Sequence, residues 1–307
     1  MRKISILLFV FFACFTHAQN ISGIEKDNIV RIEEILASDE MEGRALSSPG
    51  IEKASSFIEN EFKNIGLSFY ADLKSYRQEF KIKGKTANNV VGVLPGRSKA
   101  EEYVIFSAHY DHLGLIENGE DKVYNGANDD ASGTTAVIAL AKYFKENKLN
   151  ERTIIFVAFT AEEVGGFGSK EFSKSIDANK VVAMFNIEMI GTESKWGKNS
   201  AYITGFEKSS FGTILQQNLA QSNFKFYPDP YPAENLFYRS DNARLASLGV
   251  PAHTISTSKM DVEPNYHKLS DEVNTLDLDN MTEIIKAIAI SSKSIIDGSD
   301  TPSRVAK

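Results

Sequence analysis

The chain has 307 residues, of which 42% are hydrophobic and 24% are charged. That length and hydrophobic content can build one large α/β domain, and no linker-like stretch calls for a second. The net charge of −7 argues against a nucleic-acid partner, because phosphate backbones are bound by basic surfaces.

The first 18 residues have the pattern of a secretory signal peptide. Arg2 and Lys3 precede an uncharged apolar stretch at 4–15, and the segment ends with small residues at Ala18. The stretch is too short for a membrane span, which needs about 20 apolar residues. We predict cleavage after Ala18, export to the periplasm or the extracellular space, and no membrane span. An uncleaved anchor and lipid attachment at Cys14 are the alternatives.

The mature chain, residues 19–307, contains no cysteine, because Cys14 is the only one. A disulfide scaffold, a thiol nucleophile and a cysteine-ligated zinc are therefore excluded. Any metal must be held by His, Asp and Glu. Without Arg2 and Lys3, 32 basic residues face 41 acidic ones, which gives the mature chain a net charge of −9.

Apolar periodicity and turn residues predict strands that alternate with helices. Helices are expected at 28–38, at 52–66, from Ser132, near 168–176, and from Asp277 or Asp279 to about Ile296. Strands are expected at 76–82, 89–94, 103–108, 153–160, 181–187, 201–205 and 251–256. This order predicts a three-layer α/β fold, with a mostly parallel, mixed central sheet and helices on both faces. Ligands of such sheets collect at the carboxyl ends of the strands.

Charged or ligating side chains follow three of the predicted strands. His109 comes directly after the strand 103–108, Glu162 and Glu163 follow 153–160, and Glu188 follows 181–187. Adjacent residues project in different directions, so one of the two glutamates can bind a cation while the other handles a proton. Taken singly, His109 could be structural and Glu188 could pair with a lysine or an arginine.

Two loops add further candidates. Asp129 and Asp130 precede the helix at Ser132, where they could also cap its first turn. His267 lies in a polar loop before the last helix. Together with the strand ends, these residues supply two histidines and three carboxylates. One bridging carboxylate would let them hold two ions about 3.5–4 Å apart, which predicts metal-assisted hydrolysis.

Several motifs resemble the secreted di-zinc aminopeptidases of clan MH, which are relatives of glutamate carboxypeptidase, glutaminyl cyclase and the transferrin receptor. The resemblance runs from Met41-Glu-Gly-Arg44 through the last helix. Its most specific parts are Ser107-Ala-His-Tyr-Asp-His112, Gly126-Ala-Asn-Asp-Asp-Ala-Ser-Gly133, Ala161-Glu-Glu163 and Tyr266-His267. It implies the zinc-peptidase fold, two Zn²⁺ ions and one catalytic domain over residues 19–307.

The resemblance also implies roles for the candidate residues. Asp129 would bridge two zinc ions, with His109 and Glu163 each on one of them, and Glu188 and His267 would complete the shell of the second ion. Glu162 would be the general base.

Two further residues could support the site, and two positions differ from the family pattern. Asp111 would orient the imidazole of His109, and Tyr266 would either hydrogen-bond the developing oxyanion or only pack. Glu188 stands where the family commonly has Asp, which keeps open a site with one tight and one weak ion. Asn242 replaces a frequent His.

The implied function is hydrolysis of N-terminal residues from peptides that have a free N-terminus, by a monomer or a small homo-oligomer. A glutaminyl cyclase-like acyltransferase with one zinc and a carboxypeptidase of the same fold are the alternatives. An inactive binding domain is disfavoured, since ligands and base are all present. The aromatic, proline-rich segment 224–238 either lines an apolar side-chain pocket or packs as an ordinary long loop.

Overall fold

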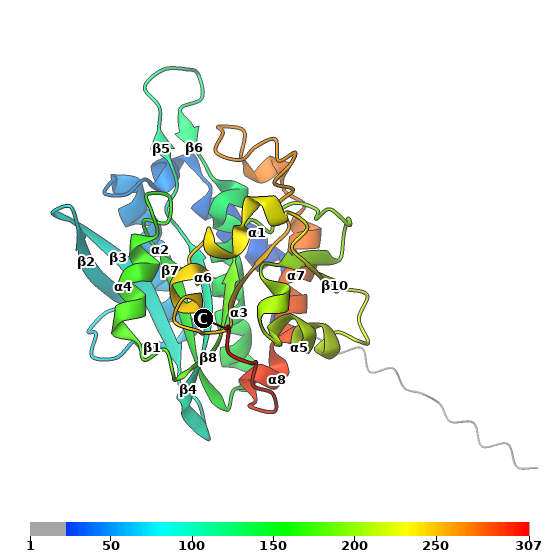
Figure 1. Cartoon of the computed structure of the whole chain (residues 1–307). Coiled ribbons are helices and arrows are strands. Elements are labelled where there is room, and N and C mark those ends of the chain that lie inside the picture. The colour runs from blue at the N-terminus through cyan, green and yellow to red at the C-terminus, as the bar shows by residue number, and fades with distance from the viewer. Residues whose placement is uncertain (1–22, 307) are drawn as a thin grey trace, which may run out of the picture.

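The computed structural model describes residues 23–306 (Figure 1), so the predicted signal peptide and Cys14 lie outside the described residues. The helices are α1 (Lys26–Leu36), α2 (Pro49–Ile65), α3 (Ser132–Asn147), α4 (Phe167–Ser175), α5 (Phe211–Asn218), α6 (Asn242–Ala246), α7 (Leu278–Ser291) and α8 (Lys293–Ile296). The strands are β1 (Ser68–Phe69), β2 (Arg77–Ile82), β3 (Lys85–Leu94), β4 (Lys99–His109), β5 (Gly114–Leu115), β6 (Val123–Tyr124), β7 (Arg152–Phe159), β8 (Val181–Ile187), β9 (Ser200–Ile203), β10 (Lys225–Pro228) and β11 (Ala252–Ser256).

Within this range, one mixed nine-stranded sheet runs through the molecule in the order β1-β3-β7-β4-β8-β11-β9-β10, with β2 paired to β3. The four central strands β7, β4, β8 and β11 are parallel to one another. Antiparallel pairs join β3 to β7 on one side and β9 to β11 on the other. The predicted mixed α/β sheet is therefore confirmed, and its parallel part lies at the centre.

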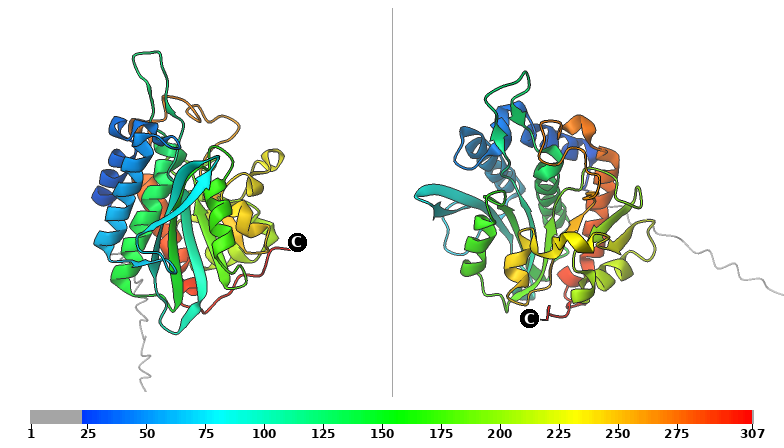
Figure 2. Two further views of the ribbon diagram at one scale, coloured as in Figure 1. Left: turned by 90° about the vertical axis from the view of Figure 1, so that its left-hand side faces the viewer. Right: turned by 45° about the horizontal axis from the view of Figure 1, so that its top comes forward.

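Helices cover both faces of this sheet (Figure 2). Helices α1, α2 and α7 all contact α3 on one face, whereas α4 and α6 contact each other on the opposite face. Neighbouring residues of the central strands alternate between the two layers. Phe106 belongs to the hydrophobic core on the α3 side, and Ile105 to the core on the α4 side. Strands buried on both faces explain why these segments are continuously apolar in the sequence.

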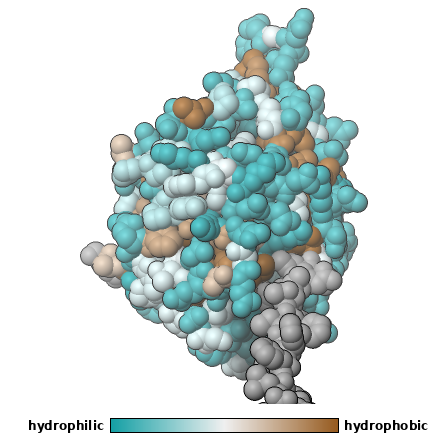
Figure 3. Space-filling model, turned by 90° about the vertical axis from the view of Figure 1, so that its right-hand side faces the viewer, coloured by the Kyte–Doolittle hydropathy of each residue, from teal (hydrophilic) through white to brown (hydrophobic). Residues whose placement is uncertain are grey.

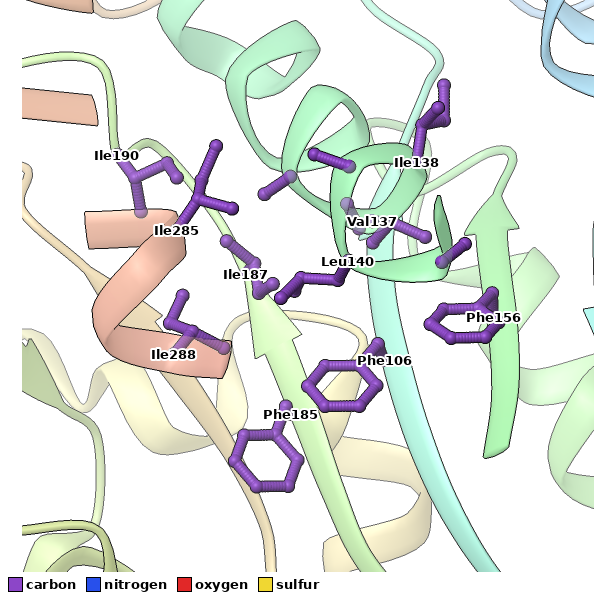
Figure 4. Packing of buried hydrophobic residues seen from close by; sticks show 14 of the residues in the cluster. Phe106, Val137, Ile138, Leu140, Phe156, Phe185, Ile187, Ile190, Ile285 and Ile288 are labelled. Atoms are coloured by element: carbon purple, nitrogen blue, oxygen red, sulfur yellow. The ribbon is translucent and has the colours of Figure 1, made fainter. Parts of the chain in front are cut away.

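Aromatic side chains fill the core between the central strands and α3 (Figure 4). The ring of Phe106 stacks on that of Phe185 at 4.7 Å between centroids and on that of Phe156 at 5.8 Å. Val137 and Leu140 of α3 are buried in the same core. This packing fixes the relative positions of the strands whose ends carry the candidate site residues.

Helix ends differ from the predicted ones where side chains compete for main-chain groups. The last helix is interrupted after Ser291, where the hydroxyls of Ser291 and Ser292 donate to main-chain oxygens three residues earlier. Asp277 rather than Asp279 caps this helix, because its carboxylate accepts from the Asn280 amide at 3.0 Å. A hairpin of β5 and β6 projects from the predicted polar loop before Asp130 (Figure 1).

Among residues 23–306, none of the helices combines the length and the hydropathy that crossing a membrane requires. The face seen in Figure 3 is mainly hydrophilic, and its hydrophobic residues form small groups rather than one broad patch.

A fully buried carboxyl, Glu33 of α1, lies inside the helical layer. Its Oε2 accepts a hydrogen bond of 2.7 Å from the Thr135 hydroxyl, while its Oε1 has no hydrogen-bond partner in the described part of the chain. Burial raises the pKa of Glu33 from its ordinary 4.5 to about 8. The folded protein therefore favours the protonated carboxyl.

We expect Glu33→Gln to stabilise the protein more at about pH 8 than at about pH 5. The stability that a raised carboxyl pKa contributes is complete below pH 4.5 and is lost as the pH rises through about 8. Glutamine keeps an acceptor for Thr135 but does not ionise, so the free energy of unfolding near pH 8 should rise on the order of 3 kcal/mol. Urea unfolding at both pH values, with a chelator present, measures this difference. An equal effect at both pH values would contradict the protonated state.

Candidate metal centre

Three neighbouring strands end at one edge of the sheet and carry four of the candidate residues. Strand β4 ends at His109, β8 ends one residue before Glu188, and Glu162 and Glu163 follow β7 in a turn. Because β7, β4 and β8 are adjacent and parallel, their carboxyl ends meet at the same edge. Glu162, Glu163 and Glu188 line one cleft there together with Asp129, Tyr266 and His267.

The two aspartates of the loop before α3 point in different directions and have different partners. The Asp130 carboxylate accepts from the amides of Gly133 and Met189, each at 3.0 Å, so it caps α3 and ties the loop to the end of β8. Asp129 points to the cleft instead. The carboxylate of Asp271 accepts from the Asp129 amide at 3.0 Å and helps to fix this loop. The capping role foreseen for this pair thus belongs to Asp130, and Asp129 is free to bind a ligand.

Asp129 lies between two imidazoles, each on a different carboxylate oxygen. Its Oδ1 is 3.2 Å from Nε2 of His109, and its Oδ2 is 3.2 Å from Nε2 of His267. Burial opposes ionisation of Asp129, but the hydrogen bonds from the two histidines outweigh it and lower its pKa. This arrangement is what a bridging carboxylate requires.

His267 and Glu163 lie against each other on one side of Asp129. Nε2 of His267 is 3.0 Å from Oε2 of Glu163, and Nδ1 of His112 is 2.8 Å from Oε1 of the same carboxylate. Hydrogen bonds that His267 donates to Asp129 and Glu163 raise the pKa of His267 to about 10. His109, Asp129 and Glu163 also have ligand atoms that all lie within 4.8 Å of one another.

The ring of His109 is oriented by the main chain of Asp111 rather than by its carboxylate. Nδ1 lies 3.1 Å from the Asp111 carbonyl oxygen, which can only accept, so Nδ1 carries a hydrogen and Nε2 is the nitrogen that could bind a metal in place of the proton it donates to Asp129. The Asp111 carboxylate, at 3.9 Å from Nδ1, instead accepts from the amides of Glu162 and Glu163 at 3.1 and 3.3 Å. Asp111 therefore positions the two glutamates as well as the imidazole, which the sequence did not predict.

Glu162 and Glu188 add two more carboxyl groups to the same cleft. Burial, together with the neighbouring Glu188 and Asp241, raises the pKa of Glu162 to about 10, although His109 opposes them. Burial likewise raises the pKa of Glu188. Within residues 23–306, no lysine or arginine forms an ion pair with Asp129, Glu162, Glu163 or Glu188. So many carboxyl groups without a lysine or arginine partner fit bound cations, and the His, Asp and Glu donors are those that zinc accepts.

The cleft has an empty volume of about 550 Å³. Tyr202, Leu236 and Met260 form an apolar part of its wall, while Thr204, Ser256 and Ser258 add hydroxyls. The segment 224–238 contributes Leu236 to it, but its phenylalanines Phe224, Phe226 and Phe237 are buried in the hydrophobic cores. These phenylalanines therefore pack in the cores rather than line the cleft, and part of the segment forms strand β10 rather than a loop.

Several residues at this site had no predicted role. His112 lies three residues after the end of β4, yet sequence alone gave it no function. Asp241 is buried, and both its oxygens lack a hydrogen-bond partner in the described structure; burial raises its pKa to about 7. Asn242 donates to main-chain oxygens of Phe237 and Ala252, so it supports the fold beside the cleft.

Comparison with known proteins agrees with the geometry. The model of peptidase family M28 matches residues 89–291. The chain belongs to peptidase family M28. This makes it a metallopeptidase, and the matched residues include every candidate ligand.

Individual relatives are distant. The chain is 27% identical over 279 residues to a probable leucine aminopeptidase of Trichophyton verrucosum, a match that covers 87% of this chain and 72% of that protein. Its fold is similar to that of BSAP, a zinc aminopeptidase from Bacillus subtilis, with a TM-score of 0.73 and 12% identity over 91% of this chain and 97% of the other. The glutaminyl cyclase of Porphyromonas gingivalis has a similar fold too, with a TM-score of 0.70 and 15% identity over 89% of this chain and 99% of that one. These structural likenesses establish the zinc-peptidase fold.

Proposed function

We propose that this M28 peptidase is an aminopeptidase that holds two zinc ions and removes residues from the free N-terminus of peptides. The observation that carries the proposal is Asp129, whose two oxygens each face a different imidazole at 3.2 Å. Relatives that are named as aminopeptidases, such as the probable leucine aminopeptidase of Trichophyton verrucosum, also support cleavage from the N-terminal end of a peptide.

The geometry favours a ligand division that differs from the one first inferred. His267 contacts Glu163 and the Oδ2 side of Asp129, so these three residues would hold one ion. His109 contacts the Oδ1 side and interacts electrostatically with Glu188, so this pair would serve the other ion with Asp129. Each ion then has one imidazole, one terminal carboxylate and the shared bridge, which leaves room for water or substrate.

Glu162 is the proposed general base. When bound, the zinc ions polarise the scissile carbonyl and lower the pKa of a nucleophilic water. Glu162 lines the cleft beside the ligands but accepts no hydrogen bond from any histidine, so it is free to take the proton of that water and return it to the leaving amine. A nearby cation lowers the high pKa of Glu162, because positive charge favours the carboxylate form.

Tyr266 is the proposed donor to the developing oxyanion. Its ring stacks on that of His267 at 3.9 Å between centroids, and it lines the cleft. Burial and the surrounding carboxylates raise its pKa, so the hydroxyl keeps its hydrogen.

The charges of the cleft bear on which end of a substrate enters it. The proposed zinc ions would neutralise Asp129, Glu163 and Glu188, so the free α-amine would be held by an ion or by a nearby carboxylate. Arg239 of the cleft wall is paired with Glu234 at 2.9 Å, so the lining of the described cleft offers no unpaired arginine to a terminal carboxylate. This favours an aminopeptidase over a carboxypeptidase. A single-zinc cyclase would not need both halves of the centre.

Export belongs to the same proposal. Residues 1–18 would be removed, leaving residues 19–307 as one catalytic domain, with lipid attachment at Cys14 as the alternative. The enzyme would act as a monomer or a small homo-oligomer.

We expect acetylation of the substrate N-terminus to abolish cleavage of an otherwise good aminoacyl substrate. The acetyl group converts the α-amine into an amide, which carries no charge and can neither coordinate an ion nor pair with a carboxylate as the amine would. Hydrolysis of Leu-, Glu- and Lys-aminoacyl substrates, compared with their acetylated forms, measures this requirement. Equal cleavage of the acetylated forms would remove the aminopeptidase assignment. A strong preference for Glu or Lys would argue only against an apolar side-chain pocket.

A further inference from the structure

The buried histidine His112 contacts a proposed zinc ligand without having been counted as one. Its side chain has no solvent exposure, and its Nδ1 lies 2.8 Å from Oε1 of Glu163. A carboxylate can only accept, so Nδ1 carries the hydrogen of this bond. The other oxygen of Glu163, Oε2, faces His267 at 3.0 Å. The two oxygens of Glu163 therefore have different partners.

We propose that His112 is a positioning residue: its hydrogen bond occupies Oε1 of Glu163 and so presents Oε2 to the zinc ion shared with His267 and Asp129. This inference rests on the proposed di-zinc function. It adds a third histidine to the centre, one that touches the ligand rather than the ion.

The distances between the side chains distinguish a hydrogen bond from His112 to a zinc ligand from direct binding of His112 to zinc. Two ligands of one tetrahedral zinc, each about 2.0–2.2 Å from it, lie about 3.3–3.5 Å apart. The contacts of Asp129 with His109 and His267, both 3.2 Å, are near that spacing. The 2.8 Å between His112 and Glu163 is instead the length of a charge-assisted hydrogen bond, and His112 is 3.9 Å from Asp129.

The imidazole of His112 is held by its surroundings, as a positioning group must be. Gly126 has a φ of +55°, and a Cβ built on it would lie 2.5 Å from the His112 ring, so only glycine allows this close approach. The ring also meets Tyr124 edge-on at 6.4 Å. The main-chain amide of His112 donates to the carbonyl oxygen of Arg44 at 3.2 Å. The direction of its Nδ1–H is thereby fixed before any ion binds.

Removing the hydrogen bond between His112 and Glu163 is expected to weaken the binding of only one of the two ions. Loss of a supporting hydrogen bond to a metal ligand lowers metal affinity about 10–100-fold. In His112→Ala, Glu163 can rotate, so the zinc-binding step that involves Glu163 and His267 should weaken by this factor. The step that involves His109 should be unchanged.

The test is the stepwise affinity of metal-free protein for zinc, measured by competition with a chromophoric chelator. The asparagine amide reaches the position of a histidine Nδ1, so His112→Asn should recover most of the affinity that His112→Ala loses. The glutamine amide reaches the position of Nε2, so His112→Gln should not. His253→Ala is the matched control, because His253 is also fully buried but bonds Thr204 and Ser209 away from the ligands.

Equal zinc affinity in all His112 variants would overturn the proposal, and so would an equal loss in His112→Asn and His112→Ala. Loss of a whole zinc ion in His112→Asn would make His112 a ligand instead. If the His112 variants do not change zinc affinity as expected, the aminopeptidase proposal still stands, because the zinc content and the hydrolytic activity of the wild type are measured separately. Thermal unfolding of the metal-free variants identifies any that do not fold, and His112→Asn, the smallest change, then decides.

Discussion

Glu162→Gln is expected to lower kcat about 10²–10⁴-fold while both zinc ions stay bound, because a positioned general base contributes about that much to a proton-transfer step. Glu162 lines the cleft but forms no ion pair with His109, His112 or His267, so its replacement should not loosen an ion. Glutamine has nearly the same shape and removes only the ability to accept the proton. Steady-state kinetics on an aminoacyl substrate, with elemental analysis of the same sample, measures both quantities.

The neighbouring residue provides the control for this variant. Glu163 lies within hydrogen-bond distance of His112 and His267, so Glu163→Gln should weaken zinc binding. If Glu162→Gln kept most of its activity with zinc bound, or lost zinc as Glu163→Gln should, the two roles would be wrongly assigned.

Asp129→Asn is expected to weaken both zinc-binding steps and to abolish hydrolysis at ordinary zinc concentrations. Each oxygen of Asp129 faces one imidazole at 3.2 Å, so this carboxylate serves both halves of the centre. Asparagine offers one neutral oxygen and cannot bridge two cations. The loss of affinity should exceed the about 10–100-fold that follows the loss of a supporting hydrogen bond.

Zinc titration of metal-free Asp129→Asn measures this change against the wild type. Asp121→Asn, in the exposed loop between β5 and β6, is the control for replacing an aspartate that does not line the cleft. Retention of one ion at wild-type affinity would show that Asp129 serves a single ion, and the bridging role would be withdrawn.

Sequence predicted the central sheet well because strands β4, β7 and β8 are buried on both faces. Such strands must be apolar where both faces are covered, as in residues 104–108 of β4 and 154–159 of β7, and the sequence displays this directly. The short elements β1, β5, β6 and β10 were not predicted, since segments of two to four residues are too short to show a periodicity. Their places are set by contacts with the rest of the fold.

Some residues of the site could likewise be recognised in the sequence, whereas others could be found only in the folded structure. His109, Glu162, Glu163 and Glu188 were recognisable because each follows a predicted strand, and adjacent parallel strands end at one edge. The grouping of His267 with Glu163 required the folded loop, as did the hydrogen bond from His112. The task of the Asp111 carboxylate was also hidden, because it bonds amides about fifty residues further along the chain.

The central claim, a paired zinc centre bridged by Asp129, is tested most directly by counting ions. Purified mature protein is loaded with zinc, desalted and subjected to elemental analysis, while hydrolysis of an aminoacyl substrate is followed as zinc is returned to the metal-free form. The expected result is close to two zinc ions per chain. A stoichiometry that stays near one would contradict the paired centre, implicate Glu188 as a failed ligand and favour a single-zinc site like that proposed for the cyclase alternative.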